Sequence, residues 1–401
     1  MIPEEHTERR FSQSPKDADF YQNPYAFYKR LHSVGGPVFW EDYGFWCLCE
    51  FDAVNNALRD SRFARLPPAG FTQPNHPPHL KDFTTVERHS LLQLEPPKHT
   101  RIRKSVNQAF VNRRVLEMQA EIESLANDLI DDFESEQETD LLTSYAMPLP
   151  VIVIAKLLGV PTSECENLLN WSHAMVRVYT LTQSHDEELL ANQAAADFKD
   201  MALSLIKDRR KNPTNDLLSH MVLQTPALSD DEIVSTAVLL LNAGHEATVH
   251  QLGNTIYTLL NLQWKKDWIG NEKRADQIIS EAMRFDAPLH LFTRYAQVAI
   301  EIYPGITIEP GEQIALLLGA ANRDPNKFKD AHAFYPERND AANVSFGAGL
   351  HFCVGAPLAK LEMRIAINTL FKRLNNLTLK EPPQVKDSFH FHGLERLLVR
   401  W

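Results

Sequence analysis

The chain has 401 residues, and 41 Lys and Arg against 52 Asp and Glu give it a formal charge of −11. Nucleic-acid-binding proteins usually carry a basic excess, so this balance argues against nucleic acid as a partner. Charged residues at 23% and hydrophobic residues at 44% exclude a disordered chain. No stretch approaches the ~18 apolar residues of a membrane helix, and the first residues lack the apolar core of a signal peptide. We therefore expect a cytoplasmic protein without a membrane partner.

The predicted elements start with a small sheet at residues 36–65, where apolar and polar side chains alternate and aromatic residues are frequent. Within it, Cys47 and Cys49 are either two strand thiols or half of a metal site whose other ligands are not nearby in the sequence. Residues 66–90 contain Pro67, Pro68, Pro74, Pro77 and Pro78 and predict a long polar loop. Loops of that length usually form lids or binding segments.

The pattern from 105 to 265 is helical, with long stretches at 115–133 and 197–211. The last third mixes short strands and turns with one helix after Pro357. No internal repeat or low-complexity linker divides the chain. We predict a mainly α protein with a minor β part, folded as a single domain over residues 1–401.

The most distinctive predicted helix begins with the capping-box pattern of Ser229 and Glu232. Apolar residues follow from 233 to 241, and the helical pattern continues to about Leu262. Since nearly all of its faces are apolar, we expect this helix to be buried. The polar segment 242–248 contains a glycine, which costs about 1 kcal/mol relative to alanine in a helix. Breaks of this kind in a local pattern tend to be functional.

A second unusual segment surrounds Cys353. Three of the fifteen glycines fall within residues 347–355, and Pro357 then opens a helical pattern. A cysteine just before a helix N-terminus is favoured as a thiolate, and glycines allow the backbone to approach a flat cofactor closely. A buried structural cysteine in a glycine-rich turn is an equally good interpretation of position alone.

The segment closely resembles the haem-ligand loop of the cytochrome P450 monooxygenases, whose pattern is F-x-x-G-x-H/R-x-C-x-G with a following Ala. The matching residues are Phe346, Gly349, His351, Cys353, Gly355 and Ala359. The resemblance implies the P450 fold, with the long helix from Ser229 lying over haem b and Cys353 as the axial thiolate of the iron. Such a ligand pushes electron density toward the iron and favours O–O cleavage.

Other segments resemble the family in the same order along nearly the whole chain. Glu281 and Arg284 resemble its E-x-x-R pair, which locks to Arg338; alone, the pair would be an ordinary surface contact on a helix. Haem propionates need cationic donors, because a buried carboxylate is expensive unless it is paired. The resemblance assigns this role to His99, Arg103, Arg294 and His351, each of which alone could be an ordinary surface or core residue.

The long helix departs from the family at one position. The family carries A/G-G-x-D/E-T-T there, and Ala243, Gly244 and Glu246 match, but Ala247 replaces the first Thr. Thr248 matches the second Thr and lies about 100° further round the helix. In the family the acid and the first Thr deliver the protons that O–O cleavage needs. We hypothesise that Glu246 works instead through ordered water or a hydroxyl of the substrate.

The resemblance implies insertion of one atom of O2 into a small organic substrate, by hydroxylation or oxidative O-demethylation. We expect a monomer that receives electrons from NAD(P)H through a ferredoxin or flavodoxin with its reductase. Candidate cations for an acidic donor, which could equally form a solvated helix face, are Arg101, Lys104, Arg113, Arg114 and Lys360. The resemblance places the substrate beside Leu240, Ala243, Leu289, His290, Leu291, Phe292 and Phe391.

Three alternatives stay open at this point. A haem enzyme driven by peroxide and a non-catalytic haem-binding protein would share the same cysteine loop. The run from His245 through Glu246 to His250 also suggests a zinc peptidase. Its spacing is one residue longer than the H-E-x-x-H motif, in which two His share one helical face.

Overall fold

The computed structural model describes residues 4–110, 112–179, 183–263, 270–338 and 342–401; the side chains at 4, 5, 109 and 112–114 are outside the described part. The chain forms two compact units. Unit 1 comprises Met1–Pro74, Asn254–Cys353 and Pro382–Glu395. Unit 2 comprises Asn75–Gly253, Val354–Glu381 and Arg396–Trp401. The cysteine loop therefore lies in unit 1, and most of the predicted long helix lies in unit 2.

Unit 1 is built on a six-stranded sheet with the strand order β1-β2-β3-β9-β6-β4. Strands β1 and β2 pair in parallel, as do β3 and β9, and the other pairs are antiparallel. The sheet strands are β1 (Arg10–Phe11), β2 (Val38–Trp40), β3 (Phe45–Leu48), β4 (Phe63–Ala64), β6 (Leu291–Ala296) and β9 (Gln313–Leu317), and a separate hairpin joins β7 (Ile300–Tyr303) to β8 (Ile306–Ile308). The helices of unit 1 are η1 (Glu4–Arg9), α1 (Ala18–Gln22), α2 (Tyr25–His32), α3 (Phe51–Ala57), α13 (Glu272–Phe285), α14 (Leu318–Ala321) and η7 (Gly349–His351).

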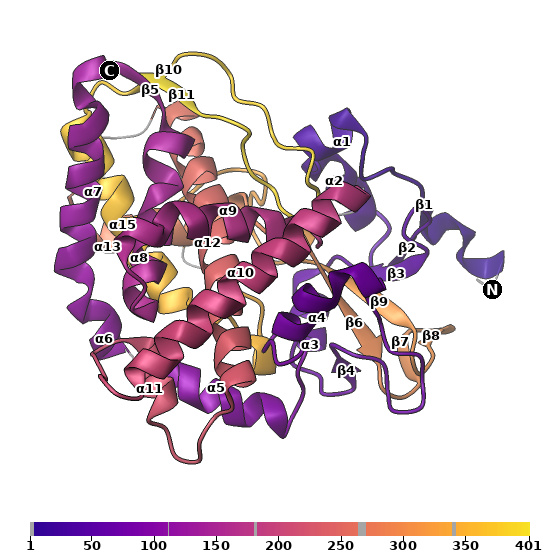
Figure 1. Cartoon of the computed structure of the whole chain (residues 1–401). Helices are drawn as coiled ribbons and strands as arrows, with labels where there is room; N and C mark the ends of the chain where they lie inside the picture. The colour runs from indigo at the N-terminus through magenta and orange to yellow at the C-terminus, as the bar shows by residue number, and fades with distance from the viewer. Residues whose placement is uncertain (1–3, 111, 180–182, 264–269, 339–341) are drawn as a thin grey trace. The chain divides into compact units, whose positions relative to one another are not determined.

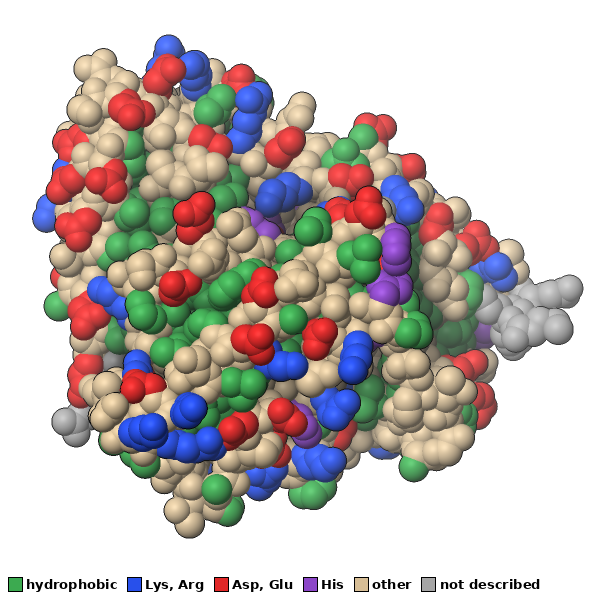
Figure 2. All heavy atoms as spheres, in the orientation of Figure 1, with side chains coloured by type: hydrophobic (Ala, Val, Ile, Leu, Met, Phe, Trp, Pro, Cys, Tyr) green, Lys and Arg blue, Asp and Glu red, His purple; other side chains and the backbone are tan. Residues whose placement is uncertain are grey.

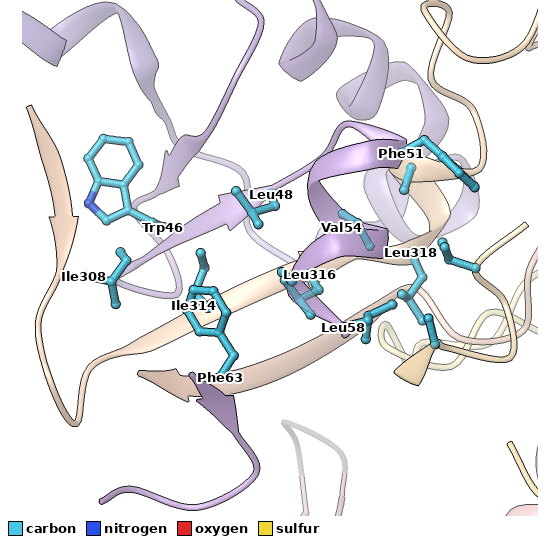
Figure 3. Close-up of a cluster of buried hydrophobic side chains, with 14 of the residues drawn as sticks. Trp46, Leu48, Phe51, Val54, Leu58, Phe63, Ile308, Ile314, Leu316 and Leu318 are labelled. Atoms are coloured by element: carbon cyan, nitrogen blue, oxygen red, sulfur yellow. The ribbon is translucent and has the colours of Figure 1, made fainter. Parts of the chain in front are cut away.

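The core of unit 1 lies between helix α3 and the sheet. Figure 3 shows Val54 and Leu58 directed toward Leu316 of β9, with Phe63 and Ile314 beside them. These side chains are at most 9% exposed. Burial of each aliphatic or aromatic side chain contributes about 1.5–3 kcal/mol, so this cluster fixes the strands that carry the later site residues.

Unit 2 is mainly helical. Its helices are η2 (Pro78–Leu80), α4 (Lys81–Glu87), α5 (Lys98–Ala109), α6 (Asn112–Glu117), α7 (Gln119–Phe133), η3 (Glu134–Glu136), the π-helical turn η4 (Leu142–Ala146), α8 (Pro148–Leu158), η5 (Thr162–Glu164), α9 (Cys165–Arg177), α10 (His185–Arg209), α11 (Leu217–Val222) and α15 (Ala356–Arg373). Helix α7 runs beside α15 (Figure 1). A small sheet with the order β10-β11-β5 joins β5 (Glu138–Asp140), β10 (Thr378–Leu379) and β11 (Leu398–Arg400).

Helix α12 (Asp230–Asn261) is the predicted long helix and has 32 residues. Its capping box is formed: the Glu232 N–H donates to Ser229 Oγ at 3.2 Å, and the Ser229 N–H donates to Glu232 Oε2 at 3.0 Å. The side chains from Ile233 to Leu241 are all buried. The prediction of a long buried helix is therefore confirmed, as is the prediction of a mainly α protein with a minor β part.

Three predicted elements were wrong in detail. Helix α3 interrupts the sheet that was predicted over residues 36–65. Residues 66–90 are not one unstructured loop, because η2 and α4 occupy 78–87. Leu80, Phe83 and Val86 are buried and recur at the spacing of a helix. The prolines that precede them led to the prediction of a loop. The stretch 115–133 is interrupted at Met118, between α6 and α7.

Among the described residues, no helix has both the length and the apolar character that crossing a bilayer requires.

Candidate active site

The cysteine loop of unit 1 is held by its own backbone. The Cys353 N–H donates to the Phe346 carbonyl at 2.9 Å, and the Gly347 N–H donates to Val344 O at 2.8 Å. Gly347 and Gly349 both have φ of +68°, a conformation that L side chains rarely adopt. A Cβ on Gly349 would also lie 2.5 Å from the Leu58 carbonyl oxygen. These two positions therefore require glycine, and the folded loop leaves Cys353 partly exposed.

A buried ion-pair network supports this loop from helix α13. Arg284 Nε and Nη2 donate to the two Glu281 oxygens at 2.8 Å each, and Arg338 Nε lies 3.2 Å from Glu281 Oε2. Arg284 also donates to three carbonyl oxygens, those of Asn322, Ala331 and Ala333. The three side chains that the resemblance joined are thus brought together as a buried triad.

The network continues from the triad to the cysteine loop through Asn322 and Ser345. Asn322 Nδ2 donates to Ser345 Oγ at 2.8 Å, and Asn322 Oδ1 accepts the Val344 N–H at 2.9 Å. Ser345 Oγ donates to the Met283 carbonyl at 2.7 Å, which ties the segment back to α13. Ser345 is next to Phe346, whose carbonyl accepts the Cys353 N–H. Sequence reasoning did not predict this contact, since no pattern in the sequence joins Asn322 to Ser345.

Two of the predicted propionate partners lie in unit 1. Arg294 is only 3% exposed, and its Nη1 donates to the Thr293 carbonyl at 2.9 Å. Its guanidinium carbon lies 5.7 Å from the centre of the Phe292 ring. His351 is partly exposed at the end of η7. A buried guanidinium needs acceptor oxygens, so Arg294 is suited to a carboxylate ligand.

The other two predicted propionate partners lie in unit 2, one turn apart on α5. His99 is buried and Arg103 is partly exposed, with Arg103 Nε donating to Asn107 Oδ1 at 2.8 Å.

Of the candidate surface cations for an acidic electron donor, Arg101 is ion-paired with Glu232 at the start of α12. Lys104 and Lys360 are exposed, and the side chains of Arg113 and Arg114 lie outside the described residues. Figure 2 shows Lys and Arg gathered near the C-terminal end of α10, with Asp and Glu among them.

Helix α12 has an open face in the middle of its buried length. Ala243 is exposed, and Gly244 and Ala247 are partly exposed, whereas Leu240 and Thr248 are buried. A Cβ on Gly244 would lie 2.8 Å from the Ile154 side chain, so the glycine permits close packing against α8. Ala243 and Ala247 are four residues apart and therefore share one face. A strip of small side chains on a helix that is otherwise buried leaves room for a flat apolar group.

The Glu246 carboxylate is surrounded by three imidazoles. Its Oε1 lies 2.9 Å from His250 Nε2, and its Oε2 lies 3.7 Å from His173 Nε2 and 3.8 Å from His245 Nδ1. His245 and His250 are buried, and the His173 side chain on α9 is 39% exposed. Donor atoms within 4.8 Å of one another are found in the group of His173, His245 and Glu246. His250 is not part of that group. The two helix histidines thus do not form the ligand pair of a zinc peptidase.

A buried polar chain that the sequence did not reveal leads from α12 to α4. Asn242, in the middle of the apolar run of α12, is hydrogen-bonded to the Tyr179 hydroxyl, which also bonds Glu87. Burial raises the pKa of the Glu87 carboxyl to about 7, and the Tyr179 hydrogen bond lowers it by a smaller amount. Asn242 could be noticed in the sequence as a polar residue in an apolar helix. Glu87 could not, because it lay in the segment that was predicted to be a loop.

We expect the Glu87→Gln variant to show the stability cost of this carboxylate. Folded Glu87 keeps its proton up to pH about 7, whereas the unfolded chain releases it near the ordinary value of 4.5. The free energy of unfolding should therefore fall as pH rises from about 4.5 through about 7, by about 3 kcal/mol at most. Urea unfolding at pH 4.5 and 8 should show E87Q gaining stability over the wild type only at the higher pH. The exposed-site control Glu123→Gln should show no such change, and a pH-independent difference for E87Q would contradict the assignment.

The predicted substrate residues divide between the units. In unit 1, Leu289 forms a bridge with Phe391, and Leu289, Phe292 and Phe391 are partly exposed, while Leu291 is buried. His290 is fully buried, with its Nδ1 2.8 Å from the Tyr28 hydroxyl. In unit 2, Leu240 is buried and Ala243 is exposed on the open face of α12.

Each unit by itself carries residues of a kind that suits a haem. Unit 1 offers a partly exposed thiol on a loop fixed by glycines, and a buried arginine. Unit 2 offers the open face of α12 and the buried His99 beside Arg103. A soft sulfur donor with cationic carboxylate partners is the donor set that haem-thiolate chemistry needs. Gly355 caps α15 and Ala359 lies in its first turn, two and six residues after the cysteine.

Comparisons with known proteins agree with this assignment. The Cytochrome P450 family model matches residues 273–398. The polyketide biosynthesis cytochrome P450 PksS of Bacillus subtilis (strain 168) is 33% identical over 96% of this chain and 97% of its own length. The biotin biosynthesis cytochrome P450 of the same strain is 32% identical over 96% of this chain and 98% of its own length. The solved structure of P450BioI in complex with hexadec-9Z-enoic acid ligated acyl carrier protein has a TM-score of 0.89 at 31% identity, covering 96% of this chain and 100% of that chain.

Members of this family bind haem, use O2 and receive electrons from external redox partners. The resemblance seen in the cysteine loop and the predicted fold class are both confirmed by these comparisons. The chain therefore belongs to the cytochrome P450 family and is a monooxygenase of the bacterial type.

Proposed function

We propose that this monooxygenase inserts one oxygen atom into an acyl or polyketide-type substrate, by hydroxylation or, where the oxidised carbon bears an ether, by oxidative O-demethylation. The substrate class is supported by the names of PksS and of the P450BioI complex with an acyl chain on its carrier protein. Cys353 would hold the haem iron, and residues 1–401 would form one domain. The propionates would be held by His99, Arg103, Arg294 and His351. Electrons would come from NAD(P)H through a ferredoxin or flavodoxin with its reductase.

The observation that carries this proposal is the position of Glu246 on α12. Bound haem supplies the activation of O2, and cleavage of the O–O bond consumes two protons that the protein must deliver. Glu246 lies one residue before the open position at Ala247, and its carboxylate is only 12% exposed. A carboxyl group in such a place can hold a proton and release it to an ordered water or to a substrate hydroxyl.

Histidines replenish the proton on Glu246 in this proposal. His173 can take a proton from solvent, since its side chain is 39% exposed. The 3.7 Å between its Nε2 and Glu246 Oε2 is closed by one water molecule or a small side-chain rotation. His250 Nε2 lies 2.9 Å from Glu246 Oε1 and is the imidazole nearest to the carboxylate. The relay thus compensates for the threonine hydroxyl that Ala247 lacks.

We expect Glu246→Gln to lower product formation by about 100-fold or more, because general acid catalysis typically contributes a factor of this size. His173→Asn should lower it less, since water can still reach the carboxylate. Turnover with a ferredoxin–reductase system and NADH is measured together with the substrate-induced spin shift of the haem. The spin shift should be unchanged in E246Q, so a loss of both signals would mean a binding defect and would contradict the proton-delivery role.

The Ala247→Thr variant separates the two routes for the final proton. If a substrate hydroxyl delivers it, the added threonine should leave the ratio of product to NADH consumed unchanged or lower it with the true substrate. A marked rise in this ratio would rule out assistance by the substrate. Equal turnover with peroxide in place of the electron donor would instead favour a peroxide-driven enzyme.

The substrate itself is found by screening acyl and polyketide compounds, free and attached to a carrier protein, for the low-to-high-spin shift. Compounds that give the shift are then tested for a product that carries one more oxygen atom. A shift without any oxidised product would favour a non-catalytic haem-binding protein.

A further inference from the structure

A compact group of two histidines and one aspartate lies in unit 1, apart from the cysteine loop. Asp286, His290 and His392 each place one donor atom within 4.8 Å of the donors of the other two. His392 Nε2 is 3.3 Å from Asp286 Oδ1. That separation is about the edge of a tetrahedron whose centre makes 2.0–2.2 Å bonds to nitrogen and oxygen, the bond lengths of zinc.

Two tyrosines hold these side chains by hydrogen bonds, as outer partners do at metal sites. The Tyr25 hydroxyl donates to Asp286 Oδ1 at 2.5 Å, and the Tyr28 hydroxyl lies 2.8 Å from His290 Nδ1. With Nδ1 engaged by Tyr28, the remaining nitrogen of His290 for a ligand is Nε2. Metal-binding histidines nearly always use their other ring nitrogen in this way, which fixes the tautomer and the ring orientation.

His290 Nε2 is what distinguishes this group from an ordinary buried ion pair. The ring is fully buried beside the Ala287 backbone, and its Nε2 makes no hydrogen bond of normal geometry with the residues that the structure describes. A buried polar atom left without a partner costs about 1–3 kcal/mol, so a bound group at this nitrogen would remove a real penalty. The centres of the His290 and His392 rings lie 4.7 Å apart, so the two imidazoles are close neighbours.

The group is accessible from a pocket of about 490 Å³ within unit 1. Asp286 and His392 line this pocket, and other lining residues are Tyr25, Arg323, Tyr257 and His332. Arg323 is fixed there, with its Nε donating to the Phe285 carbonyl at 2.7 Å and its guanidinium 4.0 Å from the centre of the Tyr25 ring. The pocket therefore gives an ion an entry path and leaves room for a water or a small anion beside it.

We propose that Asp286, His290 and His392 bind one divalent transition-metal ion of the Zn²⁺ class, with water or a small anion from the pocket in the open position. Two imidazoles and one carboxylate with an open position are a recurrent donor set for such ions. Asp286 balances one charge of the ion. Arg323 adds a positive charge nearby, so the open position should favour hydroxide or a carboxylate over a neutral ligand. The site includes His290, one of the predicted substrate residues, but shares no residue with the proposed proton relay or with the predicted haem partners.

Zinc binding to the holoenzyme tests the proposal directly. Chelator-treated protein is equilibrated with Zn²⁺ alone, and the zinc and haem contents are measured per chain. The test variant is His392→Arg, because a guanidinium can still pair with Asp286 but has no lone pair for a metal. We expect H392R to bind one zinc ion fewer than the wild type, with the haem content unchanged.

A matched control is available in unit 2, where His79, His185 and Glu188 form another group of donors within 4.8 Å. His79→Ala should leave the zinc ion at Asp286 in place, so H79A should keep the zinc equivalent that H392R loses. Tyr28→Phe keeps all three ligands and should weaken zinc binding by about 10–100-fold, as loss of an outer partner typically does. Equal zinc content in H392R and the wild type, or no zinc in the wild type, would overturn the proposal. If H392R does not fold, unchanged zinc affinity in Y28F overturns it instead.

Discussion

Replacing Cys353 with alanine is expected to abolish the thiolate-shifted Soret band of the reduced CO complex and, with it, product formation. The shift would require a thiolate as the protein ligand of the haem iron, and a side chain without sulfur cannot supply one. The measurement is the reduced-CO spectrum of C353A after reconstitution with haem. Cys165→Ala, at a partly exposed cysteine on α9, is the matched control and should keep the band.

The other cysteines are poor substitutes for Cys353. Cys47 and Cys49 are buried in unit 1, and burial raises the pKa of the Cys49 thiol to about 12 and that of Cys47 well above its ordinary value. Burial also raises the pKa of Cys165. The thiolate is the metal ligand, so a raised pKa disfavours these three residues. A C353A protein that retained the shifted band would contradict the assignment of the ligand.

Local patterns in the sequence were sufficient for some elements. The capping box at Ser229 and the apolar run after it predicted α12, because both signals lie within one helix. The helix after Pro357 appears as α15 for the same reason. Of the two interpretations of Cys47 and Cys49, the structure agrees with strand thiols: Cys47 lies on β3, Cys49 directly follows it, and both are buried.

Contacts between distant segments could not be predicted in the same way. The parallel pairing of β3 with β9 joins residues about 270 positions apart, and nothing in either strand specifies its partner. The three imidazoles around Glu246 include His173 of α9, which no helical spacing connects to α12. Asp286, His290 and His392 likewise meet across about 100 residues. The family resemblance supplied the roles of Cys353 and Glu246, but it had no counterpart for these clusters.

The second large effect is expected at the buried triad of α13. Glu281→Ala should lower the free energy of unfolding by about 3–5 kcal/mol, because it leaves the buried Arg284 and Arg338 without their shared carboxylate. Arg284 would keep its bonds to three carbonyls, which offset only part of the lost pairing. Urea unfolding, followed by circular dichroism and by haem absorbance, measures the change.

The same helix offers a control for ordinary ion pairing. Arg274 of α13 pairs with Glu337 at the surface, where both side chains are more than a third exposed. Glu337→Ala should therefore cost about 0–1 kcal/mol. Because Asn322 and Ser345 connect the triad to the carbonyl of Phe346, E281A should also release haem faster than E337A does. Equal stability and equal haem release in the two variants would show that the triad contributes no more than a surface pair. A loss of stability without faster haem release would separate the triad from the cysteine loop, and the hydrogen bonds through Asn322 would then have no role in holding the ligand.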